Sequence, residues 1–284
     1  MYNNCENGKN SANGEKMENH MKLTVLGSRG SMPVSGKEYE EFGGATTCYQ
    51  VEAGDQVILL DSGTGIFNAK NIDERMNVSI IISHVHLDHI MGLPFFPELS
   101  RKGRRLFLYG EEKLDIKNQI NTIFSKPYWP LMAGEYPSEL VIESIKFPLK
   151  LGEVIVEGMN VRHPGGNIAL KVIYKGKKIV NLSDYEHIPG ENGLFADRDV
   201  IEFCRDADMV LYDAQYTDDE YSGKKGYGHS TESEGVKLKK SAGIKKMLLV
   251  HHDPAHDDEF LRNIESKIGD ENVSFARQGQ IINV

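Results

Sequence analysis

The six-residue segment HVHLDH, residues 84–89, constrains the fold of this chain more than any other feature. It directly follows Val78–Ser83, a continuous apolar run typical of a buried strand. Where a strand runs into a loop, the first two histidines point the same way, while the aspartate and the last histidine turn back from the loop. Such an arrangement gives two adjacent cations separate ligands, and imidazole with carboxylate suits divalent ions, zinc first. The alternative interpretation is a solvated polar loop.

More residues of the metal-binding types stand where later strands are expected to stop. His163, Asp184 and the doublet His251-His252 each follow a predicted strand. Strand ends are where open sheets carry ligands. Taken singly, each residue is explained by a surface or capping role. Together with HVHLDH, however, they form one candidate ligand set. His187, three positions after Asp184, either supports a ligand or, as we expect, lies at the surface.

From Met21 onward the chain has no linker, repeat or low-complexity tract, which predicts a single domain over residues 21–284. The polar residues 1–20 are expected to form a disordered tail, and they lack the apolar segment of a signal peptide. Strand patterns are expected at Lys22–Gly27, Thr46–Ala53, Gln56–Asp61, Val78–Ser83, Val154–Glu157, Asn160–Arg162, Ile168–Tyr174, Lys178–Leu182, Met209–Tyr212 and Met247–Val250. Helical patterns cover Lys113–Phe124, Thr231–Ser241 and Glu259–Ile268. This order predicts two sheets with helices packed outside.

Composition and charge exclude other classes of protein. The longest apolar runs have the length of a strand, far short of the roughly 20 residues of a spanning helix, so membrane insertion is excluded. The net charge of −9 argues against broad binding to nucleic-acid phosphates. Three cysteines without a CxxC pair indicate reduced residues of a cytoplasmic protein.

Over about residues 22–284 the chain resembles the metallo-β-lactamase superfamily. HVHLDH, His163, the pair Ser183-Asp184 and His251 are similar to its five motifs, and DSGTG at 61–65 is similar to one of its opening turns. The resemblance implies an α/β fold, an αββα sandwich of two mixed β-sheets flanked by helices, with a dinuclear site at one edge.

The resemblance also implies a ligand set for two divalent metal ions, zinc foremost, with manganese or iron as alternatives. One ion would bind His84, His86 and His163; the other would bind Asp88, His89 and His251; and Asp184 would bridge them. His251 immediately follows its predicted strand, as the final ligand of the family does. The resemblance therefore favours His251 over His252 as the last ligand.

Two further segments resemble the phosphodiesterase branch of the superfamily. GHST at 228–231 is similar to the histidine motif of tRNase Z, the tRNA 3′-processing nuclease. YDAQYT at 212–217 is similar to the "HEAT" segment of those enzymes, with Asp213 in place of the glutamate. The resemblance implies that His229, oriented by Asp213, assists phosphate-ester cleavage. The alternative is that His229 merely precedes a capped helix.

One departure from tRNase Z bears on the substrate. Those nucleases commonly carry a long tRNA-gripping arm between the third and fourth ligand motifs, yet Asp184 stands only 21 positions after His163. With the negative net charge, this gap disfavours tRNA as a substrate. The chain is closer to small bacterial phosphodiesterase-like hydrolases, including cyclic nucleotide and cyclic ribose-phosphate phosphodiesterases.

The sequence therefore predicts a cytoplasmic, dinuclear metal-dependent hydrolase that cleaves a small-molecule or oligonucleotide phosphodiester. Asp88 would hold the attacking hydroxide as well as a metal, no membrane partner is expected, and a homodimer is compatible with this prediction. Hydrolysis of a carboxylic ester, thioester or lactone is the alternative in the same fold, and a metal-stabilised binding or sensor module is the non-enzymatic one.

Several side chains near these motifs have two interpretations. Phe95, Phe96 and Trp129 either line the cleft and stack on a base or belong to the core. Lys224 and Lys225 either contact phosphate or form a solvated basic pair.

Overall fold

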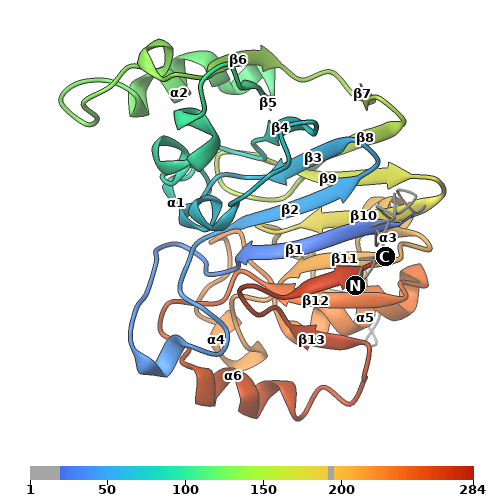
Figure 1. The fold of residues 1–284 in the computed structure, drawn as a ribbon. Helices are drawn as coiled ribbons and strands as arrows, with labels where there is room; N and C mark the ends of the chain where they lie inside the picture. The colour runs from blue at the N-terminus through green and yellow to red at the C-terminus, as the bar shows by residue number, and fades with distance from the viewer. Residues whose placement is uncertain (1–19, 191–194) are drawn as a thin grey trace, which may run out of the picture.

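The computed structural model describes residues 20–190 and 195–284, and it contains two seven-stranded sheets. The first sheet has the strand order β14 (Ile281–Asn283), β1 (Met21–Gly27), β2 (Cys48–Ala53), β3 (Gln56–Leu60), β4 (Asn77–Ile81), β5 (Arg105–Gly110) and β6 (Glu139–Ser144). The second has the order β13 (Val273–Phe275), β12 (Lys246–Val250), β11 (Met209–Asp213), β10 (Lys177–Leu182), β9 (Asn167–Tyr174), β8 (Val154–Val161) and β7 (Leu149–Leu151). Figure 1 shows the two sheets with the helices around them.

Helices connect the strands. The α-helices are α1 (Leu87–Ile90), α2 (Ile116–Ile123), α3 (Arg198–Cys204), α4 (Asp218–Tyr221), α5 (Glu232–Ala242) and α6 (Asp258–Glu265). Short 3-10 helices cover Lys37–Tyr39, Thr64–Asn68, Leu93–Phe95, Pro97–Ser100, Glu112–Leu114 and Ala133–Glu135. Within the described ranges, none of the helices is long and apolar enough to cross a bilayer.

Three hydrophobic cores define four layers. The central core joins the inner faces of both sheets, for example Leu60 of β3 and Leu211 of β11. A second core packs the outer face of β10–β12 against α3, α5 and α6. A third packs β3–β5 against α2 and the 3-10 helices. The layer order is therefore helix, sheet, sheet, helix, which confirms the predicted αββα sandwich.

Strand direction brings distant segments to one edge. β3, β4 and β5 are parallel, and β1 shares their direction because β2 is antiparallel to both β1 and β3. In the second sheet β10, β11 and β12 are parallel, and β8 shares their direction through antiparallel β9. The predicted ligands follow the carboxyl ends of β4, β8, β10 and β12, and Asp213 is the last residue of β11. They therefore meet at one edge of the sandwich.

The sequence patterns missed part of the scaffold. Strands β5, β6, β7, β13 and β14 were not predicted, because short strands at sheet edges and strands with charged ends carry little periodic signal. The two strands expected at Val154–Glu157 and Asn160–Arg162 form the single strand β8, since its ladder with β9 continues through Gly158. The predicted disordered tail, residue 20 excepted, lies outside the described residues.

Arg29 joins the two sheets at the site edge. Its side chain is fully buried directly after β1. Nε and Nη2 donate to the carbonyl oxygen of Gly43 at 3.2 and 2.9 Å, and Nη1 donates to those of Asp253 and His256 at 3.0 and 2.8 Å. Burial lowers the pKa of Arg29 to about 10, so the guanidinium stays charged at neutral pH. The loop after β12 is thereby fixed to the loop after β1.

We predict that Arg29→Met lowers the free energy of unfolding by about 3 kcal/mol or more, measured by urea titration. The substitution leaves the carbonyl groups of Gly43 and His256 without a donor, and each such buried group costs about 1–3 kcal/mol. The control is Arg75→Met, which removes an exposed arginine paired with Asp73 and should leave the urea midpoint unchanged. A loss below about 1 kcal/mol in Arg29→Met would show that other contacts hold the two loops.

Candidate metal centre

The structure brings the seven predicted ligands together in two adjoining groups. The ligand atoms within each group lie within 4.8 Å of one another. His84, His86 and His163 form the first group; Asp88, His89, Asp184 and His251 form the second. HVHLDH from the first sheet thus meets residues from three strand ends of the second sheet.

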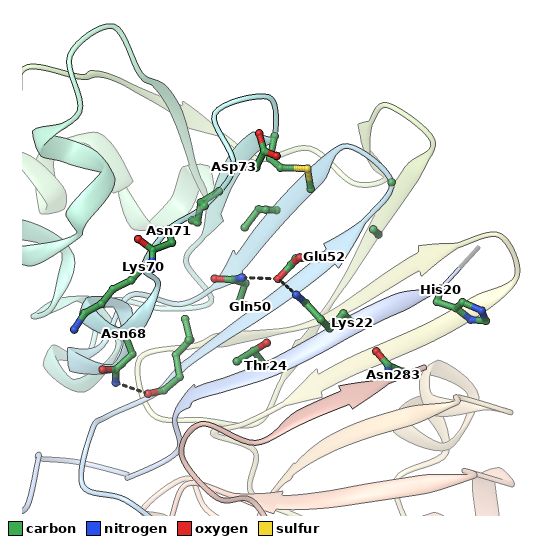
Figure 2. Close-up of a pocket in the computed structure, with 16 residues that line it drawn as sticks. His20, Lys22, Thr24, Gln50, Glu52, Asn68, Lys70, Asn71, Asp73 and Asn283 are labelled. Carbon is green, nitrogen blue, oxygen red and sulfur yellow. Dashed lines mark hydrogen bonds and ion pairs between the residues drawn. The ribbon is translucent and has the colours of Figure 1, made fainter. Parts of the chain in front are cut away.

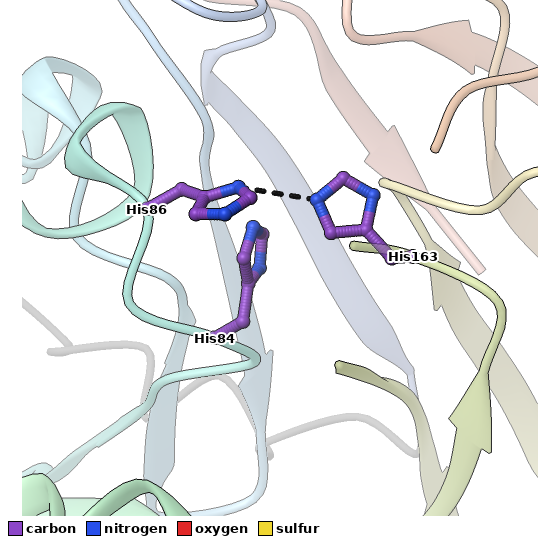
Figure 3. A group of neighbouring side chains, drawn as sticks. All are labelled: His84, His86 and His163. Atoms are coloured by element: carbon purple, nitrogen blue, oxygen red, sulfur yellow. Dashed lines mark hydrogen bonds between the residues drawn. The ribbon is translucent and has the colours of Figure 1, made fainter. Parts of the chain in front are cut away.

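The first group has the spacing of a metal site. His163 Nε2 and His86 Nδ1 are 3.1 Å apart, and Figure 3 shows the three rings pointing toward one another. Zinc–nitrogen bonds of 2.0–2.1 Å at a tetrahedral angle put ligand nitrogens about 3.3 Å apart. Burial lowers the pKa of His84 and of His86, so both rings are neutral and their nitrogen lone pairs are available.

The second group pairs two carboxylates with two imidazoles. His89 Nε2 lies 3.4 Å from Asp88 Oδ2, and His251 Nε2 lies 3.7 Å from the same oxygen. The backbone N–H of Ser31 donates to Asp88 Oδ2 at 2.9 Å and fixes its orientation. Burial opposes ionisation of Asp88, yet His89 and His251 hold its pKa below the usual value.

Asp184 stands between the two groups. Its Oδ1 is 3.8 Å from both His84 Nε2 and His163 Nε2, while its Oδ2 is 3.0 Å from His89 Nε2 and 3.2 Å from His251 Nδ1. The residue is fully buried, which disfavours the charged form, but His251 and His89 hold its pKa well below the usual range. One oxygen therefore faces each group, as in a bridging ligand.

Unpaired buried nitrogens test whether ions fit this site. Within the described part of the chain, Nε2 of His84, His89 and His251 is buried and makes no hydrogen bond of good geometry, although His89 Nε2 lies 3.0 Å from Asp184 Oδ2. Buried polar atoms are almost always satisfied, so three such nitrogens converging on carboxylates call for an additional partner. Imidazole and carboxylate are the donors that zinc and similar divalent ions prefer. The residues present fit divalent metal ions.

A network of hydrogen bonds orients two of these imidazoles, those of His84 and His89. Asp61 Oδ2 accepts from His89 Nδ1 at 3.0 Å and from the hydroxyl of Ser83 at 2.9 Å. Ser83 Oγ in turn accepts from His84 Nδ1 at 3.1 Å. Both Nδ1 protons are thereby engaged, which leaves the Nε2 lone pairs directed into the site. Asp61 begins the family-like DSGTG turn, but its hydrogen bonds to Ser83 and His89 leave no signal in the sequence.

Three site residues adopt a left-handed backbone. The φ angles are 63° at Asp61, 58° at Asp184 and 65° at His251. This region costs a residue with a Cβ about 1–2 kcal/mol. Such residues cluster at functional sites, where the surrounding structure holds a side chain in a required direction.

A buried carboxylate supports the loop before His229. Glu186 Oε1 accepts from Tyr221 Oη at 3.0 Å and from the N–H of Gly226 at 2.6 Å, while Oε2 accepts from the N–H of Gly228 at 3.1 Å. The carbonyl oxygen of Gly228 then accepts from His163 Nδ1 at 2.9 Å. Gly228 has φ 95°, and a Cβ there would clash with the His163 ring. No sequence motif marks Glu186 as a functional residue.

His229 and Asp213 form the predicted pair beside the ligands. His229 Nδ1 donates to Asp213 Oδ2 at 2.8 Å, and its ring stacks on His251 with centroids 4.7 Å apart. Asp213 also accepts from the backbone N–H groups of Asp184, Gln215 and Ser230. Burial opposes protonation, but the Asp213 carboxylate raises the pKa of His229. Thr231 caps helix α5, as the capping alternative expects, and this cap is compatible with a role for His229.

The remaining histidines lie outside the two groups. His252 Nε2 donates to the carbonyl oxygen of Ala276 at 2.8 Å and its ring contacts Phe42 and Phe275, so only His251 of the doublet enters the site. The expectation of a surface position for His187 is wrong. Its ring is buried, bonds to Ser230 at 2.9 Å and packs on Tyr221.

The aromatic residues Phe95 and Phe96 differ in burial. Phe96 is buried in the core under the first sheet. Phe95 is 55% exposed and packs edge to face on Trp129, with centroids 4.8 Å apart.

A large hollow elsewhere contains none of the predicted site residues. It occupies about 920 Å³ on the outer face of β1–β3, and Figure 2 shows its polar lining. Lys22 pairs with Glu52 at 2.7 Å, and Gln50 donates to the same carboxylate at 2.8 Å. These three side chains therefore satisfy one another within the hollow.

Comparison with known proteins identifies the family. Residues 57–252 match the family model described as "Beta-lactamase superfamily domain". A protein of Bacillus subtilis named "Probable metallo-hydrolase YhfI" is 24% identical over 284 aligned residues, which cover 91% of this chain and 98% of that protein. Ribonuclease Z of Methanosarcina acetivorans is 23% identical over 282 residues, covering 84% and 90% of the two chains.

Solved structures share the fold. The crystal structure of YhfI from Bacillus subtilis superposes with a TM-score of 0.70 at 21% identity, covering 93% of this chain and all of that one. A diphosphatase from the PhnP family gives a TM-score of 0.68 at 19% identity, covering 92% and 97%. These relatives fit the tRNase Z-like branch that the GHST and YDAQYT segments resemble. The chain belongs to the metallo-β-lactamase superfamily of hydrolases.

Proposed function

We propose that this protein is a dinuclear metal-dependent phosphodiesterase, with zinc the foremost candidate for both ions. The first ion would bind His84, His86 and His163; the second would bind Asp88, His89 and His251; and Asp184 would bridge them. One observation carries the proposal: the Asp213–His229 pair, hydrogen-bonded at 2.8 Å, stacks directly on His251 of the candidate metal centre. A metal centre alone is compatible with many hydrolytic reactions. An imidazole that Asp213 orients beside the metals favours a reaction whose leaving group needs a proton.

Each residue has a defined task in this proposal. When bound, the two ions would lower the pKa of a shared water and polarise the phosphoryl oxygens. Asp88, fixed by the N–H of Ser31, would accept a hydrogen bond from the attacking water and keep it in line with the phosphorus. Asp61 and Ser83 would keep His84 and His89 in the required tautomer.

His229 would donate a proton or a hydrogen bond from Nε2, because its Nδ1 is already engaged by Asp213. Asp213 favours the protonated ring and holds it in one orientation. The proton would go to the departing oxygen, which would otherwise leave as an unstable alkoxide.

The proposed substrate is a small or single-stranded phosphodiester rather than precursor tRNA. Between His163 and Asp184 the chain forms only the hairpin of β9 and β10, joined by the turn Lys175-Gly176. That interval therefore holds no arm that could grip a folded RNA. Among the relatives, several are named Ribonuclease Z and one structure is that of a diphosphatase.

We predict that the zinc-loaded protein cleaves bis(p-nitrophenyl) phosphate and cyclic nucleotides, and that it does not remove a tRNA 3′ trailer at physiological salt. Release of p-nitrophenolate and chromatography of the nucleotides measure the first activity, and gel analysis of a precursor tRNA measures the second. A panel of carboxylic esters, thioesters, lactones and β-lactams serves as the comparison. Accurate trailer removal would refute the choice of substrate, and turnover restricted to the acyl panel would refute the phosphodiesterase proposal.

We predict that His229→Ala retains both metals while kcat falls by about 10²–10⁴-fold for diesters with alkoxide leaving groups. The loss should be smaller for p-nitrophenyl esters, because p-nitrophenolate departs without a proton. Metal content and leaving-group dependence are measured on the same preparations.

Two further variants separate the roles of His229. Asp213→Asn should produce a milder form of the same pattern, since the imidazole remains but loses its orientation. His229→Gln keeps a hydrogen-bond donor but supplies no proton, so it should resemble His229→Ala. If all leaving groups suffer equally, proton donation is wrong; if a metal is lost, His229 is a ligand.

A further inference from the structure

A cavity of about 650 Å³ opens beside the candidate metal centre, and His163 forms part of its wall. Arg162 and Lys225 line the same cavity from two different segments, the end of β8 and the loop after α4. It is the cavity, among those described, that shares a ligand residue with the candidate centre. A group bound there would belong to a substrate whose scissile bond lies at the metals.

Neither cationic side chain has a direct partner among the residues that the structure describes. Arg162 and Lys225 are exposed, and neither makes a hydrogen bond or ion pair within the described ranges. The backbone of Arg162 is nevertheless fixed, because its carbonyl oxygen accepts from the N–H of Glu186 at 2.9 Å. In a chain with a net charge of −9, the two cations of this cavity outnumber its one carboxylate, Glu186, and this local excess of positive charge favours an anion.

The buried carboxylate of Glu186 is part of the cavity wall and holds the neighbouring loop in place. Its two oxygens already accept from Tyr221, Gly226 and Gly228, as described above. Those three bonds anchor both ends of the segment that presents Lys225. Because Gly228 also bonds to His163, the cavity and the first ligand group are held in one arrangement. Little ordering is then needed when a ligand binds.

We propose that this cavity binds a second phosphate group of the substrate, so that the preferred substrates carry a phosphate monoester in addition to the scissile diester. This inference rests on the proposed phosphodiesterase function. The guanidinium of Arg162 suits two phosphate oxygens at once, and the ammonium of Lys225 supplies a compact second charge. Lys224 is not part of the site, because it lies over the rings of Tyr216 and Tyr227.

The test compares two ligands that differ by one phosphate. Calorimetry on the zinc-loaded protein measures the Kd of thymidine 3′,5′-bisphosphate and of thymidine 5′-monophosphate. The wild-type protein should prefer the bisphosphate, and Arg162→Gln and Lys225→Gln should each reduce that preference by about 10-fold, the value of one charge-assisted hydrogen bond. Raising the salt concentration should shrink the preference, because exposed charges are screened within about 10 Å.

Lys102→Gln is the matched control. Lys102 is an exposed lysine that lines a different cavity and precedes β5, at the opposite end of the parallel strands from the site. It should keep the wild-type preference. Metal content is measured on every variant, since Arg162 adjoins the proposed ligand His163.

The outcomes distinguish this inference from the proposed function. If both variants retain the wild-type preference, or if the two ligands lose affinity equally, the second-phosphate site is wrong. If the wild-type protein cleaves bis(p-nitrophenyl) phosphate but binds the bisphosphate and the monophosphate equally well, the proposed phosphodiesterase function stands and the proposed second-phosphate site is wrong. If the variants lose the preference but no diester is cleaved, the anion site stands and the assigned reaction falls.

Discussion

The buried carboxylate of Asp184 is the group on which the rest of the site depends. It is 1% exposed, and its two oxygens lie against imidazoles supplied by both sheets. An isolated carboxylate in such a place would be neutral or would unfold the edge of the sandwich, because burying an unpaired charge is costly. Here the histidines keep it charged, and two divalent ions would complete the compensation that the orphaned Nε2 atoms also require.

The packing of the two sheets fixes the positions of the ligands around Asp184. HVHLDH follows β4 of the first sheet, whereas His163, Asp184 and His251 follow strands of the second. The distance between the ligands of the first sheet and those of the second is therefore set by the central core between the sheets and by the Arg29 bridge at their edge. Cores are close-packed and deform little, which suits a site that must keep reacting groups within a fraction of an ångström.

The sequence indicates the candidate ligands and the Asp213–His229 pair more readily than the residues that hold these side chains in position. HVHLDH, His163, Asp184 and His251 were found because they are polar residues at strand ends, and His229 with Asp213 because their segments resemble a known branch. Asp61, Glu186 and Arg29 were missed as supports, because their partners lie far along the chain and include backbone groups that leave no sequence signal. The surface position expected for His187 failed for the same reason: its burial depends on Ser230 and Tyr221, which only the fold brings near.

Anomalous diffraction at the zinc absorption edge, on crystals of the zinc-reconstituted protein, tests the central claim most directly. The account predicts two peaks about 3.5–4 Å apart. One should lie among His84, His86 and His163, the other among Asp88, His89 and His251, with Asp184 contacting both. His84→Ala should lose the first peak preferentially. A single peak in the wild-type protein, or two peaks that do not share Asp184, would contradict the dinuclear assignment.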